Sequence, residues 1–348
     1  MEKKISKKSS VLLIYTGGTI GMMQDARSGE LKPFDFKSLT SQIPELNKFD
    51  INLSSKAFKK PLDSSNMHPD VWIELVRIIE KNYEKFDGFV ILHGSDTMSF
   101  TASALSFMLE NLNKPVVLTG SQLPIGLIRT DGKENLITAI EIAAAREKGK
   151  PVISEVCIYF EYKLYRGNRT FKNNSEHFDA FKSPNYPELA EAGVDIKYNY
   201  SALLKVGNKK LKIHTELNND IAVLKLFPGI SKKITLAIIS APGVKAVILE
   251  TFGAGNASTA TWFTEVLETA IKKGVIVLNI TQCHEGKVIQ GMYETSSQLK
   301  KIGVVSGEDL TFESAVTKLM FLLAQKKSET DIRKLLQTNL RGELTNGL

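Results

Sequence analysis

The amino-acid sequence predicts an α/β protein, with a mostly parallel sheet flanked by helices in a larger N-terminal domain and a smaller C-terminal α/β domain. Short β-branched runs, typical of buried strands, alternate with longer segments whose apolar residues recur at helical spacing. Strands that alternate with helices form βαβ units, and both faces of the resulting parallel sheet are covered. The chain has 348 residues, which is about 2.3 times the usual domain length and favours two domains.

The N-terminal domain is expected over residues 1–195, and its elements can be assigned in order. Four buried runs predict strands, at residues 11–15, 89–93, 115–119 and 156–160. Between these runs, apolar residues recur at helical spacing in segments 71–85, 98–111 and 132–148. One face of the second of these helices would carry Leu105, Met108, Leu109 and Leu112.

Residues 196–220 break this pattern, because they are polar, rich in Asn and Lys, and only weakly amphipathic. We interpret them as a linker between the two domains. The alternation then resumes in a C-terminal domain over residues 221–348, where strands are expected at 222–227, 246–249 and 274–281. Two helices are expected in the same domain, at residues 258–273 and 311–325.

Composition and charge give no support to a nucleic-acid or membrane protein. The net charge is +7, but the Lys residues are scattered, and no basic stripe is interleaved with aromatic residues. No uncharged apolar stretch approaches the ~18–20 residues that span a bilayer. Two cysteines, Cys157 and Cys283, are typical of a reducing compartment, although the count leaves room for one bridge. We therefore expect a cytoplasmic protein with no nucleic-acid and no membrane partner.

Motifs for several common chemistries are missing from the sequence. The five histidines are scattered without an H-E-x-x-H pattern, and the cysteines do not form C-x-x-C. The glycine-rich loops that bind phosphates or dinucleotides are absent, as is the G-x-S-x-G turn of the α/β-hydrolases. We expect no metal and no cofactor.

Polar residues gather in the loops that follow the predicted strands. Hydroxyl groups stand beside glycine in three such loops, at residues 16–21, 93–98 and 119–122. In an open α/β sheet, ligands bind at this edge, beyond the carboxyl ends of the strands. Each loop alone has a plainer interpretation, in which Thr19 or Asp96 only caps a helix. Their gathering at one edge of the sheet favours a functional site.

Two further polar clusters are open to either interpretation. Asp63, Ser64 and Ser65 precede a helix that begins with proline, and such residues often serve only as caps. Residues 166–172 carry several cations, and most runs of this kind are solvated loops. If folding brought Lys172 next to Asp96, the two would form a charge pair able to tune a neighbouring hydroxyl.

Seven short motifs follow one another along the chain, at residues 15–22, 63–67, 91–98, 164–170, 252–257, 281–288 and 339–345. In this order they resemble the L-asparaginases, most closely the cytoplasmic bacterial type I branch. The resemblance implies hydrolysis of the side-chain amide of L-asparagine to L-aspartate and ammonia, without metal or organic cofactor. It also implies a homo-oligomer, either a homodimer or a dimer of dimers.

The resemblance further implies roles for individual residues. Thr19 matches the first catalytic threonine of the family, which is the nucleophile. Ser95 stands where most members have a second catalytic threonine, and Asp96 and Lys172 match the catalytic aspartate and lysine. Ser64 and Ser65 lie in the segment that holds the α-carboxylate of the substrate. The substrate-binding residues are expected to be Asp63, Ser64, Ser65, Gly94, Ser121 and Asn256, the last of them near a subunit interface.

The chemistry of an amide agrees with these roles. Because an amide resists water, a covalent acyl-enzyme replaces one difficult step by two easier ones. No histidine stands at the matched catalytic positions, so Ser95, Lys172 and Asp96 would have to relay the proton from Thr19. Backbone N–H groups of the Gly94–Ser95 turn are candidates for an oxyanion hole. Asp96 would also bind the α-ammonium group of the substrate.

Two departures from the family pattern leave alternatives open. Ser95 lacks the methyl group that fixes the rotamer of a threonine. The lid segment 22–33 contains no tyrosine, so another group, Tyr15 or a residue of a partner subunit would assist Thr19. The alternative functions are an amino-acid-binding module and a subunit of a transamidation complex, both with little activity alone. The sequence does not decide between asparagine and glutamine, which differ by one methylene.

Overall fold

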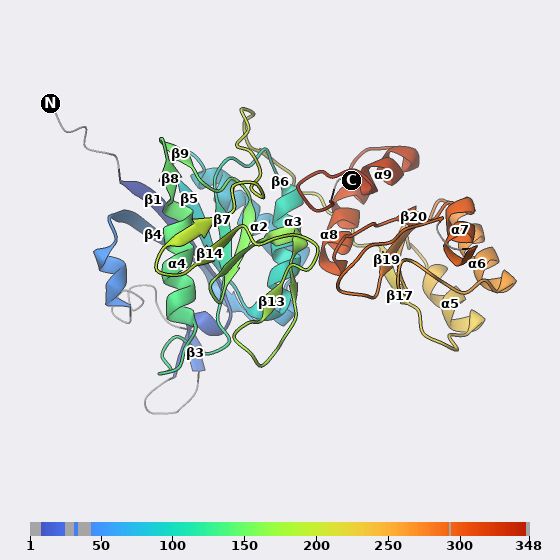
Figure 1. Ribbon diagram of the computed structural model, residues 1–348, viewed down its shortest axis with the longest axis horizontal. Helices are drawn as coiled ribbons and strands as arrows, with labels where there is room; N and C mark the ends of the chain where they lie inside the picture. The colour runs from blue at the N-terminus through green and yellow to red at the C-terminus, as the bar shows by residue number, and fades with distance from the viewer. Residues whose placement is uncertain (1–7, 25–30, 34–42, 292–293, 346–348) are drawn as a thin grey trace. The chain divides into compact units, whose positions relative to one another are not determined.

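The computed structural model places the chain in two units, one built on a mostly parallel sheet and the other on a parallel sheet (Figure 1). It describes residues 8–24, 31–33, 43–291 and 294–345. Unit 1 comprises Met1–Ser183 and Pro187–His214, and unit 2 comprises Pro184–Tyr186 and Thr215–Leu348. The division after His214 falls inside the segment 196–220, which we expected to be a linker.

Unit 1 contains an eight-stranded sheet with the strand order β15-β14-β11-β10-β7-β5-β1-β4. Five neighbouring strands are parallel: β4 (Ile51–Leu62), β1 (Ser9–Gly17), β5 (Gly88–Leu92), β7 (Val116–Thr119) and β10 (Val156–Phe160). Three antiparallel strands continue the sheet: β11 (Lys163–Arg166), β14 (Ala190–Ala192) and β15 (Ile196–Tyr198). Strands β5, β7 and β10 are buried along their whole length, which explains their unbroken apolar sequences. The prediction of a mostly parallel sheet is confirmed.

Helices cover both faces of this sheet. Figure 1 shows α4 (Gly132–Ala144) on one side, and α2 (Pro69–Asn82) and α3 (Met98–Met108) on the other. Helix α2 begins after His68, whose ring accepts a hydrogen bond from the amide of Asp70, and proline occupies its first position. Apolar side chains on one face of α2, including Trp72, are buried.

Helix α3 ends at Met108, earlier than the predicted residue 111. The next residues, Leu109–Glu110 (β6), pair with Lys212–Ile213 (β16) instead of extending the helix. This pairing also attaches the C-terminal part of the expected linker to unit 1. Strand β15, which pairs with β14, attaches its N-terminal part.

Helix α4 ends at Ala144, before the predicted residue 148. Arg146–Glu147 (β8) and Lys150–Pro151 (β9) form a small hairpin. Its two turn residues both have positive φ, as a tight two-residue turn requires. Apolar periodicity gives no signal for such a hairpin, since all four strand residues are exposed or only half-buried.

Short elements connect the larger ones in unit 1. Two further two-stranded pairs are β2 (Met22–Gln24) with β3 (Leu31–Pro33), and β12 (Phe171–Lys172) with β13 (Phe181–Lys182). The 3-10 helices are η1 (Thr19–Gly21), η2 (Pro44–Lys48), η3 (Ser64–Asn66), η4 (Ser95–Thr97) and η5 (Gly167–Arg169). Four of these five 3-10 helices belong to the polar segments that the sequence analysis singled out.

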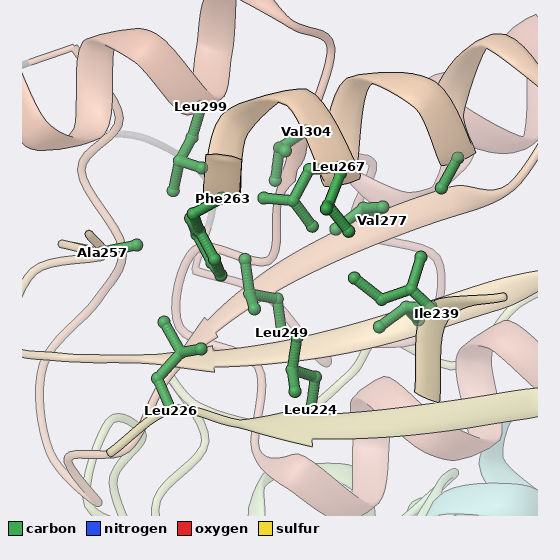
Figure 2. Packing of buried hydrophobic residues seen from close by; sticks show 13 residues of the cluster. Leu224, Leu226, Ile239, Leu249, Ala257, Phe263, Leu267, Val277, Leu299 and Val304 are labelled. Atoms are coloured by element: carbon green, nitrogen blue, oxygen red, sulfur yellow. The ribbon is translucent and has the colours of Figure 1, made fainter. Parts of the chain in front are cut away.

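Unit 2 is a smaller α/β unit, as predicted. Its four parallel strands are β17 (Ile221–Lys225), β18 (Ala246–Thr251), β19 (Ile276–Thr281) and β20 (Val305–Ser306). Its helices are α5 (Lys232–Ile239), α6 (Thr261–Lys272), α7 (Glu294–Lys301), α8 (Phe312–Leu323) and α9 (Glu329–Leu336). Figure 2 shows the core between sheet and helices, where Leu249 and Val277 from the strands lie near Phe263 and Leu267 from α6.

Candidate active site

Three of the polar segments meet at Gly94 in unit 1. A Cβ placed on Gly18 would lie 2.4 Å from the amide nitrogen of Gly94, so the loop that carries Thr19 packs against the turn that carries Ser95. A Cβ placed on Gly94 would lie 2.6 Å from Oγ of Ser64. Glycine is therefore required at both positions, and Gly18 also has a φ of 86°. These contacts bring together the loops after β1 and β5 and the segment before α2.

The side chain of Lys172 reaches the same turn. Its Nζ lies 2.8 Å from Oγ of Ser95 and 2.7 Å from Oδ1 of Asp96. The side chain of Lys172 is only 17% exposed, whereas that of Asp96 is 65% exposed. The structure thus forms the charge pair that the sequence analysis considered, and it adds the Ser95 hydroxyl as a third member.

The cationic segment before Lys172 is buried, so the interpretation of residues 166–172 as a solvated loop is wrong. Arg166 and Arg169 are 3% and 1% exposed. The guanidinium of Arg166 pairs with the buried carboxylate of Glu155 at 2.5 Å and donates to the carbonyl of Ala202. Glu155 also accepts a hydrogen bond from the amide of Leu204. Paired charges of this kind can be buried, because each finds a partner inside the protein.

Gln122, which we did not single out from the sequence, completes the contacts of Ser95. The Ser95 hydroxyl donates to Oε1 of Gln122 at 3.2 Å, and Nε2 of Gln122 donates to the carbonyl of His177 at 3.0 Å. The only sequence signal was its place in the third polar loop, directly after Ser121. Ser121 itself is 2% exposed, and among the described residues its hydroxyl has no hydrogen-bond partner. A role of Ser121 in substrate binding stays a prediction.

Asp63, Ser64 and Ser65 form the turn before α2. Asp63 caps η3, and its Oδ1 accepts hydrogen bonds from the amide and the hydroxyl of Ser65, at 2.8 and 2.6 Å. These bonds lower the pKa of the Asp63 carboxyl. Ser64 is buried, and its carbonyl accepts a hydrogen bond from the hydroxyl of Thr97. The segment therefore has the expected capping geometry and also lies beside the Gly94 turn.

Thr19 begins η1 and is partly exposed. At the end of η1, the carbonyl of Gly21 accepts a hydrogen bond of 3.1 Å from the hydroxyl of the buried Tyr15. Burial raises the pKa of Tyr15 to about 12, so its phenol stays protonated at neutral pH. This contact favours a supporting role for Tyr15 in the turn. Half of the lid segment 22–33, at residues 25–30, lies outside the described residues.

A buried chain of hydrogen bonds lies beneath the turn. Nε1 of Trp72 donates to the hydroxyl of Thr101, which contacts Nε2 of His93 at 2.9 Å. Nδ1 of His93 lies 2.7 Å from the carbonyl oxygen of Gly94. Burial lowers the pKa of His93 to about 4, so the ring is neutral and its Nδ1–H donates to Gly94. His93 therefore holds the carbonyl of the residue at which the site loops meet.

The remaining predicted site residue, Asn256, belongs to unit 2. It closes a turn in which Phe252 and Asn256 exchange backbone hydrogen bonds of 2.8 and 2.9 Å.

Within the described part of the chain, no group of three or more His, Cys, Asp or Glu side chains could hold a metal ion. Among the described helices, none combines the length and the apolar character needed to cross a bilayer.

Models of protein families match both units of the chain. Residues 10–204 match the model "Asparaginase, N-terminal", and residues 220–336 match the model "Glutaminase/Asparaginase C-terminal domain". The chain therefore belongs to the asparaginase family, and the resemblance found in its motifs is confirmed.

Individual relatives are similar over nearly the whole chain. L-asparaginase 1 of Escherichia coli (strain K12) is 42% identical over 344 residues, which are 97% of this chain and 99% of that protein. The crystal structure of L-asparaginase I from Vibrio cholerae has a TM-score of 0.90 and 39% identity, covering 98% of this chain and 100% of that one. A 60 kDa lysophospholipase of Mus musculus is 38% identical over 99% of this chain but only 64% of its own length.

Proposed function

We propose that this protein hydrolyses the side-chain amide of L-asparagine to L-aspartate and ammonia. The observation that carries the proposal is the position of Lys172, whose Nζ contacts both Ser95 and Asp96 beside the loop of Thr19. Such a set of hydroxyl, amine and carboxylate can move a proton without histidine or metal. The similarity to L-asparaginase 1 and L-asparaginase I supports asparagine as the substrate.

In the proposed mechanism, the hydroxyl oxygen of Thr19 attacks the amide carbon. Nζ of Lys172 gives a proton to the leaving nitrogen, which departs as ammonia when the C–N bond breaks, and the proton of Thr19 passes through Ser95 to restore the proton that Lys172 has lost. Water then attacks the acyl-enzyme, and its proton returns to Thr19 as aspartate leaves. The amides of Gly94 and Ser95 would stabilise the oxyanion, and each such donor typically contributes ~3–4 kcal/mol.

Recognition of a free amino acid follows from the polar groups around the turn. We propose that Ser64 and Ser65 bind the α-carboxylate, and that the carboxylates of Asp63 and Asp96 bind the α-ammonium group. Gly94 lies between these groups, next to the proposed reaction centre. An ion pair with an exposed carboxylate and several hydroxyls suit a small zwitterion better than the acyl chain of a lysophospholipid.

The remaining proposals concern assembly and location. We propose a cytoplasmic homo-oligomer, a homodimer or a dimer of dimers, in which Asn256 lies near a subunit interface. Light scattering coupled to size-exclusion chromatography measures the assembly directly. A monomer that is fully active would contradict a role for a partner subunit.

The decisive experiment measures ammonia release from L-asparagine by purified protein. Thr19→Ala removes the nucleophile and should reduce turnover to background, and Lys172→Met should lower kcat at least ~100-fold. Lys182→Met is the matched control, because Lys182 is exposed on the neighbouring strand β13. Full turnover in Thr19→Ala or Lys172→Met would remove that residue from the mechanism.

Substrate choice needs a second measurement on the wild-type protein. The ratio of kcat/KM for L-asparagine and L-glutamine should favour asparagine, although one methylene supplies only ~1–3 kcal/mol of discrimination. A lysophospholipid ester serves as the third substrate. Binding of asparagine in a calorimeter without ammonia release would instead indicate an amino-acid-binding module.

A further inference from the structure

The hydroxyl of Ser95 is held from two sides. It accepts a hydrogen bond from Nζ of Lys172 at 2.8 Å and donates to Oε1 of Gln122 at 3.2 Å. A serine has no β-methyl group, so its χ1 is free to choose among three staggered rotamers. A catalytic hydroxyl at this position therefore needs contacts on both sides of Oγ to stay in one rotamer.

The amide of Gln122 is itself oriented by a second contact. Its Nε2 donates to the backbone carbonyl of His177 at 3.0 Å. Only the nitrogen end of an amide can donate to a carbonyl, so this contact directs Oε1 toward Ser95. Gln122 therefore presents a fixed acceptor to the serine hydroxyl.

The backbone of Gln122 is anchored to helix α4. The carboxylate of Asp131, which is 7% exposed, accepts hydrogen bonds from the amides of Gln122 and Leu123, at 2.9 and 3.2 Å. The side-chain amide of Asn135 donates to both Asp131 and the carbonyl of Gly120. This buried anchor gives the loop a rigid support, which a positioning residue requires.

We propose that Gln122 is a positioning residue that fixes the rotamer of Ser95 and so holds its Oγ at Lys172. The inference rests on the proposed amide hydrolysis and adds a residue to it. Gln122 acts through Ser95 rather than through the substrate, so it affects kcat and leaves KM nearly unchanged. Its action also depends on residue 95 being a serine, because the β-methyl of threonine restricts χ1 by itself.

A double-mutant cycle tests this dependence. Gln122→Met keeps the length and volume of the side chain and removes both hydrogen bonds. In the wild-type background it should lower kcat about 3- to 10-fold, the range of one lost hydrogen bond, with KM within twofold. In the Ser95→Thr background the same substitution should lower kcat less than about twofold. Gln337→Met, at an exposed position after α9, is the matched control and should change neither constant.

Gln122→Glu separates positioning from loss of structure, because it keeps an oxygen acceptor for Ser95. It should retain more of kcat than Gln122→Met, with both variants showing wild-type circular dichroism. Equal losses of kcat for Gln122→Met in the two backgrounds, or a rise in KM alone, would overturn the inference. If the wild type releases ammonia and Gln122→Met keeps full kcat, this inference is wrong and the proposed function still holds. A wild type without any release overturns the proposed function and this inference together.

Discussion

Gly18 and Gly94 contact each other through their backbones, although they belong to loops that follow different strands of the sheet. The space between them is too small for a single methyl group, since a Cβ on Gly18 would also lie 2.5 Å from Cα of Gly94. This contact fixes the distance between the loop of Thr19 and the turn of Ser95. The candidate active site thus depends on two residues that carry no functional group.

Gly18→Ala should therefore disable the enzyme as well as destabilise it. The new methyl must displace the Gly94 turn, and a φ of 86° is unfavourable for alanine; together these should cost about 2–5 kcal/mol of unfolding free energy. A shift of about 1 Å between Thr19 and Ser95 should lower kcat about 100-fold. Gly149→Ala is the matched control, because Gly149 has a φ of 80° but nothing within 4 Å of its Cβ position. Equal effects of the two substitutions on kcat would contradict this explanation.

The buried His93 makes the stability of unit 1 depend on pH. Its pKa is about 4 in the folded protein and about 6.5 in an unfolded chain. The unfolded state binds the proton more readily, so this stabilisation is complete above pH 6.5 and is lost as the pH falls toward 4. Between pH 7 and pH 5 the wild type should lose about 2 kcal/mol more unfolding free energy than His93→Asn. Urea unfolding at both pH values, followed by the fluorescence of the nearby Trp72, measures the difference; parallel losses in the two proteins would contradict it.

Much of the fold could be predicted because the central strands are buried on both faces. Strands β5, β7 and β10 gave unbroken apolar runs, and the helices between them gave clear periodicity. Strand β4 was missed, because most of its twelve residues are exposed and show no apolar pattern. Strands β14 and β15 were missed because each has only three residues. Such short strands are stabilised by their pairing partners, which local sequence does not reveal.

The candidate site likewise has residues that could be predicted from the sequence and residues that could not. Thr19, Ser95 and Asp96 stood out because each lies in a recognisable motif, and Lys172 stood out at the end of the cationic segment 166–172. The contact of Gln122 with Ser95 joins two loops that are far apart in sequence, and no local pattern encodes it. The burial of Arg166 was equally hidden, since its partner Glu155 comes from another part of the chain, directly before β10.

Lys318 and Glu343 form an ion pair in unit 2 that is fully buried, with 2.6 Å between Nζ and Oε1. Lys318 also donates to the carbonyls of Leu336 and Thr338, so it ties α8 to the end of α9. Lys318→Met leaves the Glu343 carboxylate buried without its cation and should cost about 3–5 kcal/mol of unfolding free energy. The control Lys272→Met breaks an exposed pair and should cost at most about 0.5 kcal/mol. In urea unfolding, similar midpoints for the two variants would show that the buried pair contributes little.

Glu313 gives unit 2 a pH dependence of the opposite sign to that of His93. Burial is the main cause that raises the pKa of Glu313 to about 7, and the carboxylate of Glu250 raises it further. Because the folded state binds this proton more tightly than the unfolded state, the stabilisation is complete below pH 4.5 and is lost as the pH rises through 7. Glu313→Gln cannot titrate, so its unfolding free energy relative to the wild type should increase by up to about 3 kcal/mol between pH 4.5 and pH 8. Urea unfolding followed by circular dichroism at these two pH values measures the change. A constant difference in unfolding free energy between the two proteins would show that Glu313 does not cause the pH dependence.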